Sequence, residues 1–176
     1  MKNFNLKKLV TSMTFLALVC AVPAQAAANR LSDGSKAIGL ILGNPSGVTG
    51  KMWLEDSHAV DMGLSFSSDS FILVYADYLL HFPGLFGSSS TFTENLKPYL
   101  GLGAELSFAR DSNRIGSRYL TAGGSSMGIG VRIPIGAEWM VPDAPFGIFL
   151  EIAPVFGIAP TSYSVVESGV GVRWYF

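Results

Sequence analysis

The two histidines and their acidic neighbour are the residues best able to do catalytic chemistry. Asp77 and His81 are four residues apart, so in an extended strand they share a face, as the acid and base of a Ser-His-Asp hydrolase must. Four strand residues span roughly 13 Å, however, which is too far for a direct hydrogen bond. No nearby serine has a distinctive context. We therefore predict no catalytic site, with His58 in a turn and His81 at a strand rim.

Cofactor chemistry is not indicated either. The sequence has no zinc-type ligand spacing and no phosphate loop, so no metal and no cofactor are expected. Gly101-x-Gly103 and Gly169-x-Gly171 are interpreted as strand glycines rather than dinucleotide fingerprints. The only cysteine, Cys20, lies in a segment expected to be removed, which leaves no thiol nucleophile and no disulfide.

The N-terminus has the pattern of a secretory signal peptide. Positive charge comes first, from three lysines (Lys2, Lys7 and Lys8). An apolar run at 9–22 follows, and Ala24-Gln25-Ala26 is a small-residue cleavage site. We predict that residues 1–26 are cleaved and that 27–36 form a short lead-in. The alternatives are a membrane anchor, for which the run is too short, and a lipoprotein site at Cys20.

Removal of the signal peptide makes the chain acidic. Nine of the 12 Lys and Arg residues remain, against 13 Asp and Glu. That balance excludes the basic footprint of a nucleic-acid-binding protein. The mature chain is apolar overall, yet no stretch approaches the ~18 consecutive apolar residues of a membrane helix.

Eight segments of alternating hydrophobicity, separated by Gly, Pro, Ser, Asp and Asn, are the elements that must position these side chains. In each segment one face is bulky and apolar, and the other mixes glycine with isolated charges. Val60, Met62 and Leu64, for example, oppose Asp61 and Gly63. The segments are 37–43, 47–54, 58–67, 70–82, 95–109, 126–140, 145–158 and 163–176.

The glycines decide which face points inward. Glycine on a water-exposed strand face weakens the strand and packs nothing, whereas inside a narrow eight-stranded barrel it makes room for long neighbours. In lipid, only helices and closed barrels satisfy every backbone polar group. We predict an all-β fold, an eight-stranded antiparallel up-and-down transmembrane β-barrel over residues 37–176. A soluble barrel or sandwich with its apolar face inside is the alternative.

Aromatic residues support a membrane barrel if both termini are periplasmic. Outward-facing aromatic residues then form two girdles, as expected at the two membrane interfaces. The periplasmic girdle comprises Tyr78, Phe82, Trp139, Phe146, Trp174 and Phe176, and the other comprises Phe66, Phe108 and Phe156.

The C-terminal residues carry a family resemblance. The chain ends Val170-Gly171-Val172-Arg173-Trp174-Tyr175-Phe176. A terminal Phe with apolar residues at every second position before it looks like the C-terminal signature of bacterial outer-membrane barrels. With the signal peptide and eight strands, the chain resembles small barrels of the OmpX and OmpA-membrane-domain type. The resemblance implies an outer-membrane location and recognition of Trp174 and Phe176 by the barrel-assembly machinery.

Ten charged residues are expected on the inner face: Lys51, Asp61, Asp77, Lys97, Glu105, Arg132, Glu138, Glu151, Glu167 and Arg173. Folding each hairpin about its turn pairs neighbours of opposite charge. The expected pairs are Lys51 with Asp61, Asp77 with Lys97, Glu105 with Arg132, and Glu151 diagonally with Arg173. These pairs form either a static network that fills the lumen or a gate whose pairs exchange partners to open a narrow ion path.

One loop offers a binding hypothesis. Arg110, Arg114 and Arg118 lie in the long third outer loop, with only Asp111 opposing them. Such a cluster could hold lipopolysaccharide phosphates through charge-assisted hydrogen bonds. A solvated basic loop is the alternative.

The function expected from these patterns is a non-catalytic, structural or envelope role for a barrel with a charged, mostly plugged lumen. Its partners would be outer-membrane lipid, lipopolysaccharide and, during biogenesis, the barrel-assembly machinery. A narrow ion or small-solute pore is the first rival, and the eight-strand size disfavours it. A lipid-modifying membrane enzyme is the second.

Overall fold

The computed structural model describes residues 34–66, 71–109, 127–160 and 162–176, and most of them are in β-strands. The elements are β1 (Lys36–Asn44), β2 (Ser46–Glu55), β3 (His58–Phe66), β4 (Phe71–His81), α2 (Thr91–Asn95), β5 (Leu96–Ala109), β6 (Met127–Arg132), β7 (Ile135–Met140), β8 (Phe146–Ala159) and β9 (Tyr163–Tyr175). The predicted signal peptide, residues 1–26, lies outside the described residues.

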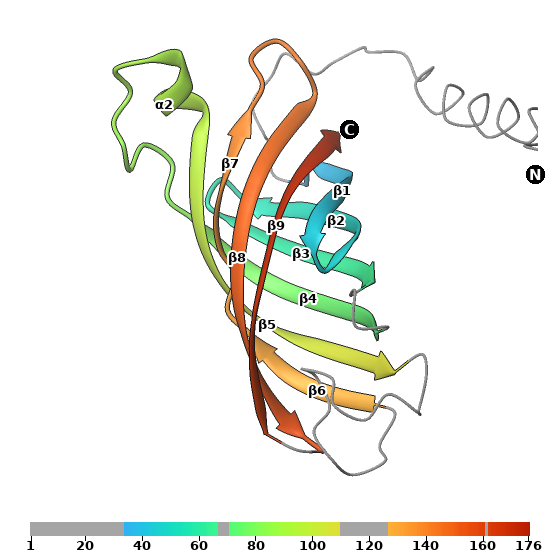
Figure 1. The fold of residues 1–176 in the computed structure, drawn as a ribbon. Helices are drawn as coiled ribbons and strands as arrows, with labels where there is room; N and C mark the ends of the chain where they lie inside the picture. The colour runs from blue at the N-terminus through green and yellow to red at the C-terminus, as the bar shows by residue number, and fades with distance from the viewer. Residues whose placement is uncertain (1–33, 67–70, 110–126, 161) are drawn as a thin grey trace, which may run out of the picture.

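The strands form a closed antiparallel ring (Figure 1). Consecutive strands pair around the ring, with β6 and β7 both lying between β5 and β8, and β9 returns to pair with β1 from Ala37↔Tyr175 to Asn44↔Ser168. Closure leaves the sheet without an open edge, so its backbone polar groups are satisfied within the wall. The predicted eight-stranded antiparallel barrel is thereby confirmed, with segment bounds that agree to within a few residues.

The sixth predicted segment, 126–140, is divided into β6 and β7. Both halves pair with β5 on one side and with β8 on the other, so they form one position in the ring. The interruption falls at Ile133 and Pro134, because proline has no N–H to donate to the ladder. Two hydrogen bonds hold the gap in place: Ile133 N donates to Pro154 O, and Gly101 N donates to Pro134 O at 2.7 Å.

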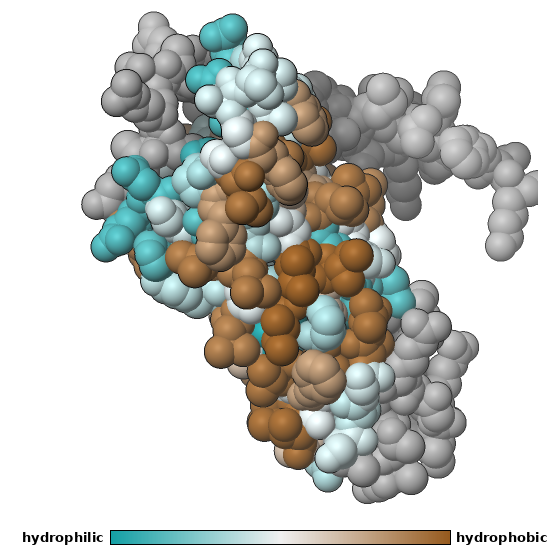
Figure 2. Space-filling model, turned by 90° about the vertical axis from the view of Figure 1, so that its left-hand side faces the viewer, coloured by the Kyte–Doolittle hydropathy of each residue, from teal (hydrophilic) through white to brown (hydrophobic). Residues whose placement is uncertain are grey.

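Side chains alternate between an apolar outer face and a polar inner face, as the sequence predicts. In β8, Glu151 is buried at 2% exposure, while its neighbours Leu150 and Ile152 are 60% and 50% exposed. Figure 2 shows brown apolar side chains gathered along the visible face of the wall, with paler and teal residues between them. The arrangement is the reverse of that in a soluble protein and matches a barrel whose outside faces lipid.

Inward-facing glycines give the interior room for aromatic rings. A Cβ on Gly63 would strike the ring of Tyr75, and one on Gly171 would strike the ring of Phe149. These ring positions over glycine bear out the reasoning that placed the glycine face inside the barrel.

The interior has apolar ends. At the termini end, where β1 begins and β9 ends, buried residues from six strands form a cluster: Ala37, Trp53, Ala59, Leu79, Tyr99 and Tyr175. At the far end, Leu73, Val155 and Val165 form a second cluster. The charged residues lie on the strands between the two clusters, except Lys97, which lies at the termini end of β5 beyond Tyr99.

The connection between β4 and β5 contains the five-residue helix α2, which the strand pattern did not predict. The helix begins after Ser90, whose hydroxyl accepts a hydrogen bond from Thr93 N in a capping box. Figure 1 places it at the termini end, beside the start of β5. Among the described residues no helix is long and apolar enough to cross a membrane.

Candidate functional site

The barrel interior holds nearly all of the predicted inward charges. Lys97, at the termini end, is only partly buried. The other nine are almost fully buried: Lys51, Asp61, Asp77, Glu105, Arg132, Glu138, Glu151, Glu167 and Arg173. Because a buried charge must be paired or neutralised, their partners define what the interior can do.

Arg132 is the centre of one set of contacts, here named the Arg132 cluster. Its guanidinium donates to three carboxylates: Nε to Glu167 at 3.1 Å, Nη2 to Glu151 at 2.6 Å, and Nη1 to Asp77. Its Cζ also lies 4.2 Å from the ring centre of Tyr75. One planar donor thus joins three strands, β4, β8 and β9, to β6.

The carboxylates of this cluster have further neighbours. Tyr99 donates its hydroxyl to Glu151 Oε2 at 2.7 Å. Glu105 is fully buried beside Glu167. Within the described part of the chain, no donor hydrogen-bonds to either Glu105 oxygen. The Arg132 cluster therefore holds four carboxyl groups around a single guanidinium, an excess of acid.

Arg173 is the centre of a second set, the Arg173 cluster. Its Nη2 donates to Asp61 and, at 3.2 Å, to Thr49 Oγ1, and its Nη1 lies 3.4 Å from Glu138. Lys51 Nζ lies 2.5 Å from the same Glu138 oxygen. Two cations therefore face two carboxylates, and this cluster is balanced.

Hydrogen bonds and one aromatic ring complete the Arg173 cluster. Thr49 donates to Asp61 at 2.8 Å, and Tyr175 donates to Glu138 at 2.6 Å. The guanidinium of Arg173 lies over the ring of Phe149, with Cζ 3.8 Å from its centre. Each charged group thus has several partners, as a stable buried ion pair requires.

His81 lies inside the barrel, which corrects its predicted place at the rim. Its Nε2 is 2.8 Å from Lys51 Nζ, and its ring is 4.2 Å from that of Trp53 and 5.2 Å from that of Tyr99. The side chain is buried because His81 has the same inward-facing parity on β4 as Asp77, and at the termini end it joins the buried aromatic rings. Asp77 contacts Arg132 instead, so Asp77 and His81 do not act as an acid–base pair.

The predicted hairpin partners are only partly right. Lys51 lies opposite Asp61 in the β2–β3 register, as expected. Their ion pairs nevertheless go elsewhere, from Lys51 to Glu138 and from Asp61 to Arg173. Long side chains in a narrow lumen reach strands on the opposite wall, and register alone does not determine their partners.

None of the other three expected pairs forms an ion pair among the described residues, although Glu105 does lie near Arg132, diagonally in the β5–β6 register. Asp77 lies opposite Gly103, and Lys97 lies opposite Glu138. Arg132 forms ion pairs with Asp77, Glu151 and Glu167 but not with Glu105. Glu151 pairs with Arg132 and not with Arg173. Barrel closure brings β9 next to β1, from where Arg173 reaches Asp61 of β3, and hairpin reasoning does not include this closure.

Some interior residues were missed from the sequence. Thr49 and Trp53 have the same parity as Lys51, and Tyr75 has the same parity as Asp77. Parity along each strand was the signal that could have found them, because residues two apart share a face.

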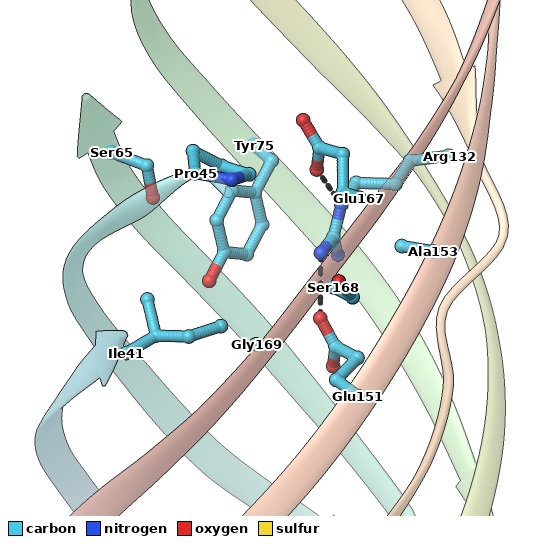
Figure 3. A pocket seen from close by; sticks show the side chains of 10 residues that line it. All are labelled: Ile41, Pro45, Ser65, Tyr75, Arg132, Glu151, Ala153, Glu167, Ser168 and Gly169. Atoms are coloured by element: carbon cyan, nitrogen blue, oxygen red, sulfur yellow. Dashed lines mark hydrogen bonds and ion pairs between the residues drawn. The ribbon is translucent and has the colours of Figure 1, made fainter. Parts of the chain in front are cut away.

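A small pocket lies against the Arg132 cluster. Figure 3 shows Arg132, Glu151 and Glu167 on one side of it, with the ring of Tyr75 across from them. Its open space accommodates about one water molecule. No group of His, Cys, Asp and Glu in the described ranges is placed to hold a metal ion.

The predicted surface sites have different outcomes. Trp174 and Phe176 lie side by side at the end of β9, with ring centres 5.6 Å apart. Their role in assembly stays a prediction. Arg110, Arg114 and Arg118 lie outside the described residues.

The closed ring, the apolar outer wall and the charged interior define the class: the chain has the fold of the small eight-stranded outer-membrane β-barrels. No family model matches the sequence, and no curated protein does.

The fold is similar to those of several solved structures. The N-terminal β-barrel domain of Pseudomonas aeruginosa OprF is similar over 82% of this chain and 98% of that one, with a TM-score of 0.61 and 18% identity. Neisserial surface protein A is similar over 81% and 94%, with a TM-score of 0.51 and 18% identity. A de novo designed transmembrane β-barrel is similar over 84% and 100%, with a TM-score of 0.50 and 14% identity. At these identities the likeness shows the fold.

Proposed function

We propose that this protein is a non-catalytic bacterial outer-membrane β-barrel with a plugged interior and a structural role in the cell envelope. The observation that carries the proposal is the pair of ion-pair clusters centred on Arg132 and Arg173. Between them they join strands from around the ring across the lumen. A barrel braced in this way is a rigid membrane element rather than a wide channel.

The membrane location rests on the outer wall. Large apolar residues are exposed on every strand, for example Leu42 on β1 and Leu102 on β5. A water-soluble monomer rarely exposes so extended an apolar surface. The signal-peptide pattern adds an export route, and the C-terminal Phe176 adds a signal for the barrel-assembly machinery. Both termini would then be periplasmic, and Arg110, Arg114 and Arg118 could meet lipopolysaccharide phosphates.

A narrow pore is the second candidate, and the acid excess of the Arg132 cluster favours it. Four carboxyl groups around one guanidinium would attract small cations if Arg132 swung aside. The three carboxylate contacts of Arg132 oppose that movement, because breaking a buried ion pair is costly. We therefore give the plugged state precedence.

A lipid-modifying activity has less support. Both histidines already have a hydrogen-bonding partner. His81 contacts Lys51, and Nδ1 of His58 lies 2.7 Å from the hydroxyl of Tyr78. Lipid A mass profiles of cells with and without the protein test this activity, and a mass shift that depends on the protein would contradict the non-catalytic role.

A deletion strain tests the structural role. Cells that lack the protein should become more sensitive to detergent, while their uptake of small solutes stays unchanged. The wild-type chain should restore resistance, and an Arg132→Ala, Arg173→Ala chain that still reaches the membrane should restore it less well. Slower solute uptake in the deletion strain, with normal detergent resistance, would instead identify a pore.

A further inference from the structure

The connection between β4 and β5, residues 82–95, exposes an unusual amount of apolar surface. Leu85, Phe86 and Phe92 are 63%, 60% and 56% exposed, and Phe82 is also exposed. Four large apolar side chains in one short connection need a partner, because exposed apolar patches on soluble surfaces are rare.

The connection is continuous with the outer wall of the barrel. The ring of Phe92 lies 6.0 Å from the ring of Trp139. Trp139 points outward from β7, since its neighbour Glu138 is buried inside and its cross-strand partner Ile148 is exposed. Helix α2 thus packs against the outside of the barrel, at the level of the aromatic girdle, and not over its mouth.

The local structure gives the connection a defined shape. Ser90 caps α2, and Asn95 Nδ2 donates to Thr91 O at 2.8 Å. Gly84 and Gly87 have positive φ angles of 78° and 75°, which side-chain-bearing residues rarely adopt. Between these glycines lie Leu85 and Phe86, the two most exposed apolar residues of the connection.

Its composition indicates the kind of partner. Glu94 is the only charged residue in 82–95, and the remaining polar residues are mainly Ser and Thr, with Asn95. A segment that binds anionic lipid through charge carries Lys and Arg, which this one lacks. Aromatic and apolar side chains beside an interfacial Trp are typical of burial at the boundary between headgroups and acyl chains.

We propose that the 82–95 connection is a membrane-interface anchor that inserts Leu85, Phe86 and Phe92 into the phospholipid leaflet at the termini end. The inference rests on the membrane location proposed above. It gives the longest connection at this end a purpose: to widen the barrel's footprint in that leaflet and fix its depth.

Site-directed labelling tests the anchor. Single cysteines replace Phe86, Phe92, Ser89 or Met62 in a chain whose Cys20 is changed to Ser, and each carries an environment-sensitive fluorophore. The proteins are purified from membranes and reconstituted into zwitterionic phosphatidylcholine vesicles with bromine at different acyl-chain depths. Met62 is the membrane control because it is exposed on the wall at mid-strand, and Ser89 is the water control.

Labels at 86 and 92 should be quenched at a shallow depth, roughly 5–10 Å into the headgroup and acyl boundary. The label at 62 should be quenched more deeply, and the label at 89 should not be quenched. Quenching should be unchanged by added salt. Labels at 86 and 92 that behave like the one at 89, while 62 is quenched, would overturn the anchor alone. Absence of quenching at 62 in folded protein would overturn the membrane location as well.

Discussion

Arg173, near the end of the last strand, forms an ion pair with Asp61 of β3 across the barrel interior, and both side chains are buried. This contact joins β9 to a strand that is not its neighbour in the ring. It therefore forms only once the barrel has closed, which makes it a reporter of the closed state.

Replacing Arg173 with Ala should destabilise the barrel strongly. Asp61 keeps only Thr49 as a hydrogen-bond donor, and a buried charge left without its partner costs about 3–5 kcal/mol. The urea midpoint in detergent measures the effect. Lys36→Ala is the control, because Lys36 is exposed at the barrel end and should leave the midpoint unchanged. If the urea midpoint of Arg173→Ala changed as little as that of Lys36→Ala, water would have to solvate the interior.

A double-mutant cycle should distinguish the observed contact between Asp77 and Arg132, which meet over Gly103 of β5, from the expected hairpin pair of Asp77 and Lys97. Arg132→Ala and Asp77→Asn should show a coupling energy of roughly 0.5–3 kcal/mol, because the two side chains are in contact. Lys97→Ala and Asp77→Asn should be additive, since Asp77 lies opposite Gly103. Strong coupling between Lys97 and Asp77 would restore the hairpin pairing and contradict the observed one.

The predicted ion-pair partners were wrong because the sequence pattern shows which face of a strand a residue lies on, but not which strands the closed ring brings together. Alternation alone put Glu138 inside and Trp139 outside, and it put Glu151 between two outward-facing residues; all of these are correct. Which charges form ion pairs depends on where the two strands that carry them lie around the closed ring. No local pattern around Asp77 reveals that it meets Arg132 of β6 over Gly103 of the strand between them.

The break in the sixth strand and the place of His81 were missed for different reasons. Pro134 marks the break, but alternation continues on both sides of it, so the pattern resembles one strand. His81 has the parity of Asp77 and belongs inside by that rule. Its position near the strand end suggested an exposed rim residue. How close to the strand ends the buried aromatic cluster reaches is determined only in the folded barrel.

Glu105→Gln should leave stability unchanged or raise it. Glu105 is buried beside the carboxyl group of Glu167 and accepts no hydrogen bond from a donor in the described ranges, so a neutral amide of the same shape fits this site without a buried charge. The urea midpoint should be no lower than that of the wild type, with any gain in the free energy of unfolding at most about 1–3 kcal/mol. Glu151→Gln is the matched control and should be destabilising, since Glu151 holds Arg132. A loss in Glu105→Gln as large as in Glu151→Gln would show a missing partner for Glu105.

Gly103→Ala should destabilise the barrel, whereas Gly50→Ala should be tolerated. A Cβ at Gly103 would collide with the carbonyl oxygen of Ala76 and with Asp77, and overpacking of this kind costs about 1–3 kcal/mol. The nearest atom to a Cβ at Gly50 is 3.7 Å away, an ordinary contact. The difference between the two urea midpoints measures the effect. Equal midpoints would mean that β4 and β5 can move apart without cost.

Single-channel recording in planar bilayers tests the central claim, that the Arg132 and Arg173 clusters close the lumen. Wild-type protein should be silent when a heat-dependent shift in gel mobility verifies that the inserted barrel is folded. Discrete current steps in the wild type, with a size that changes in Glu105→Gln or Arg132→Gln, would contradict the plugged interior and make the Arg132 cluster the gate of a narrow pore.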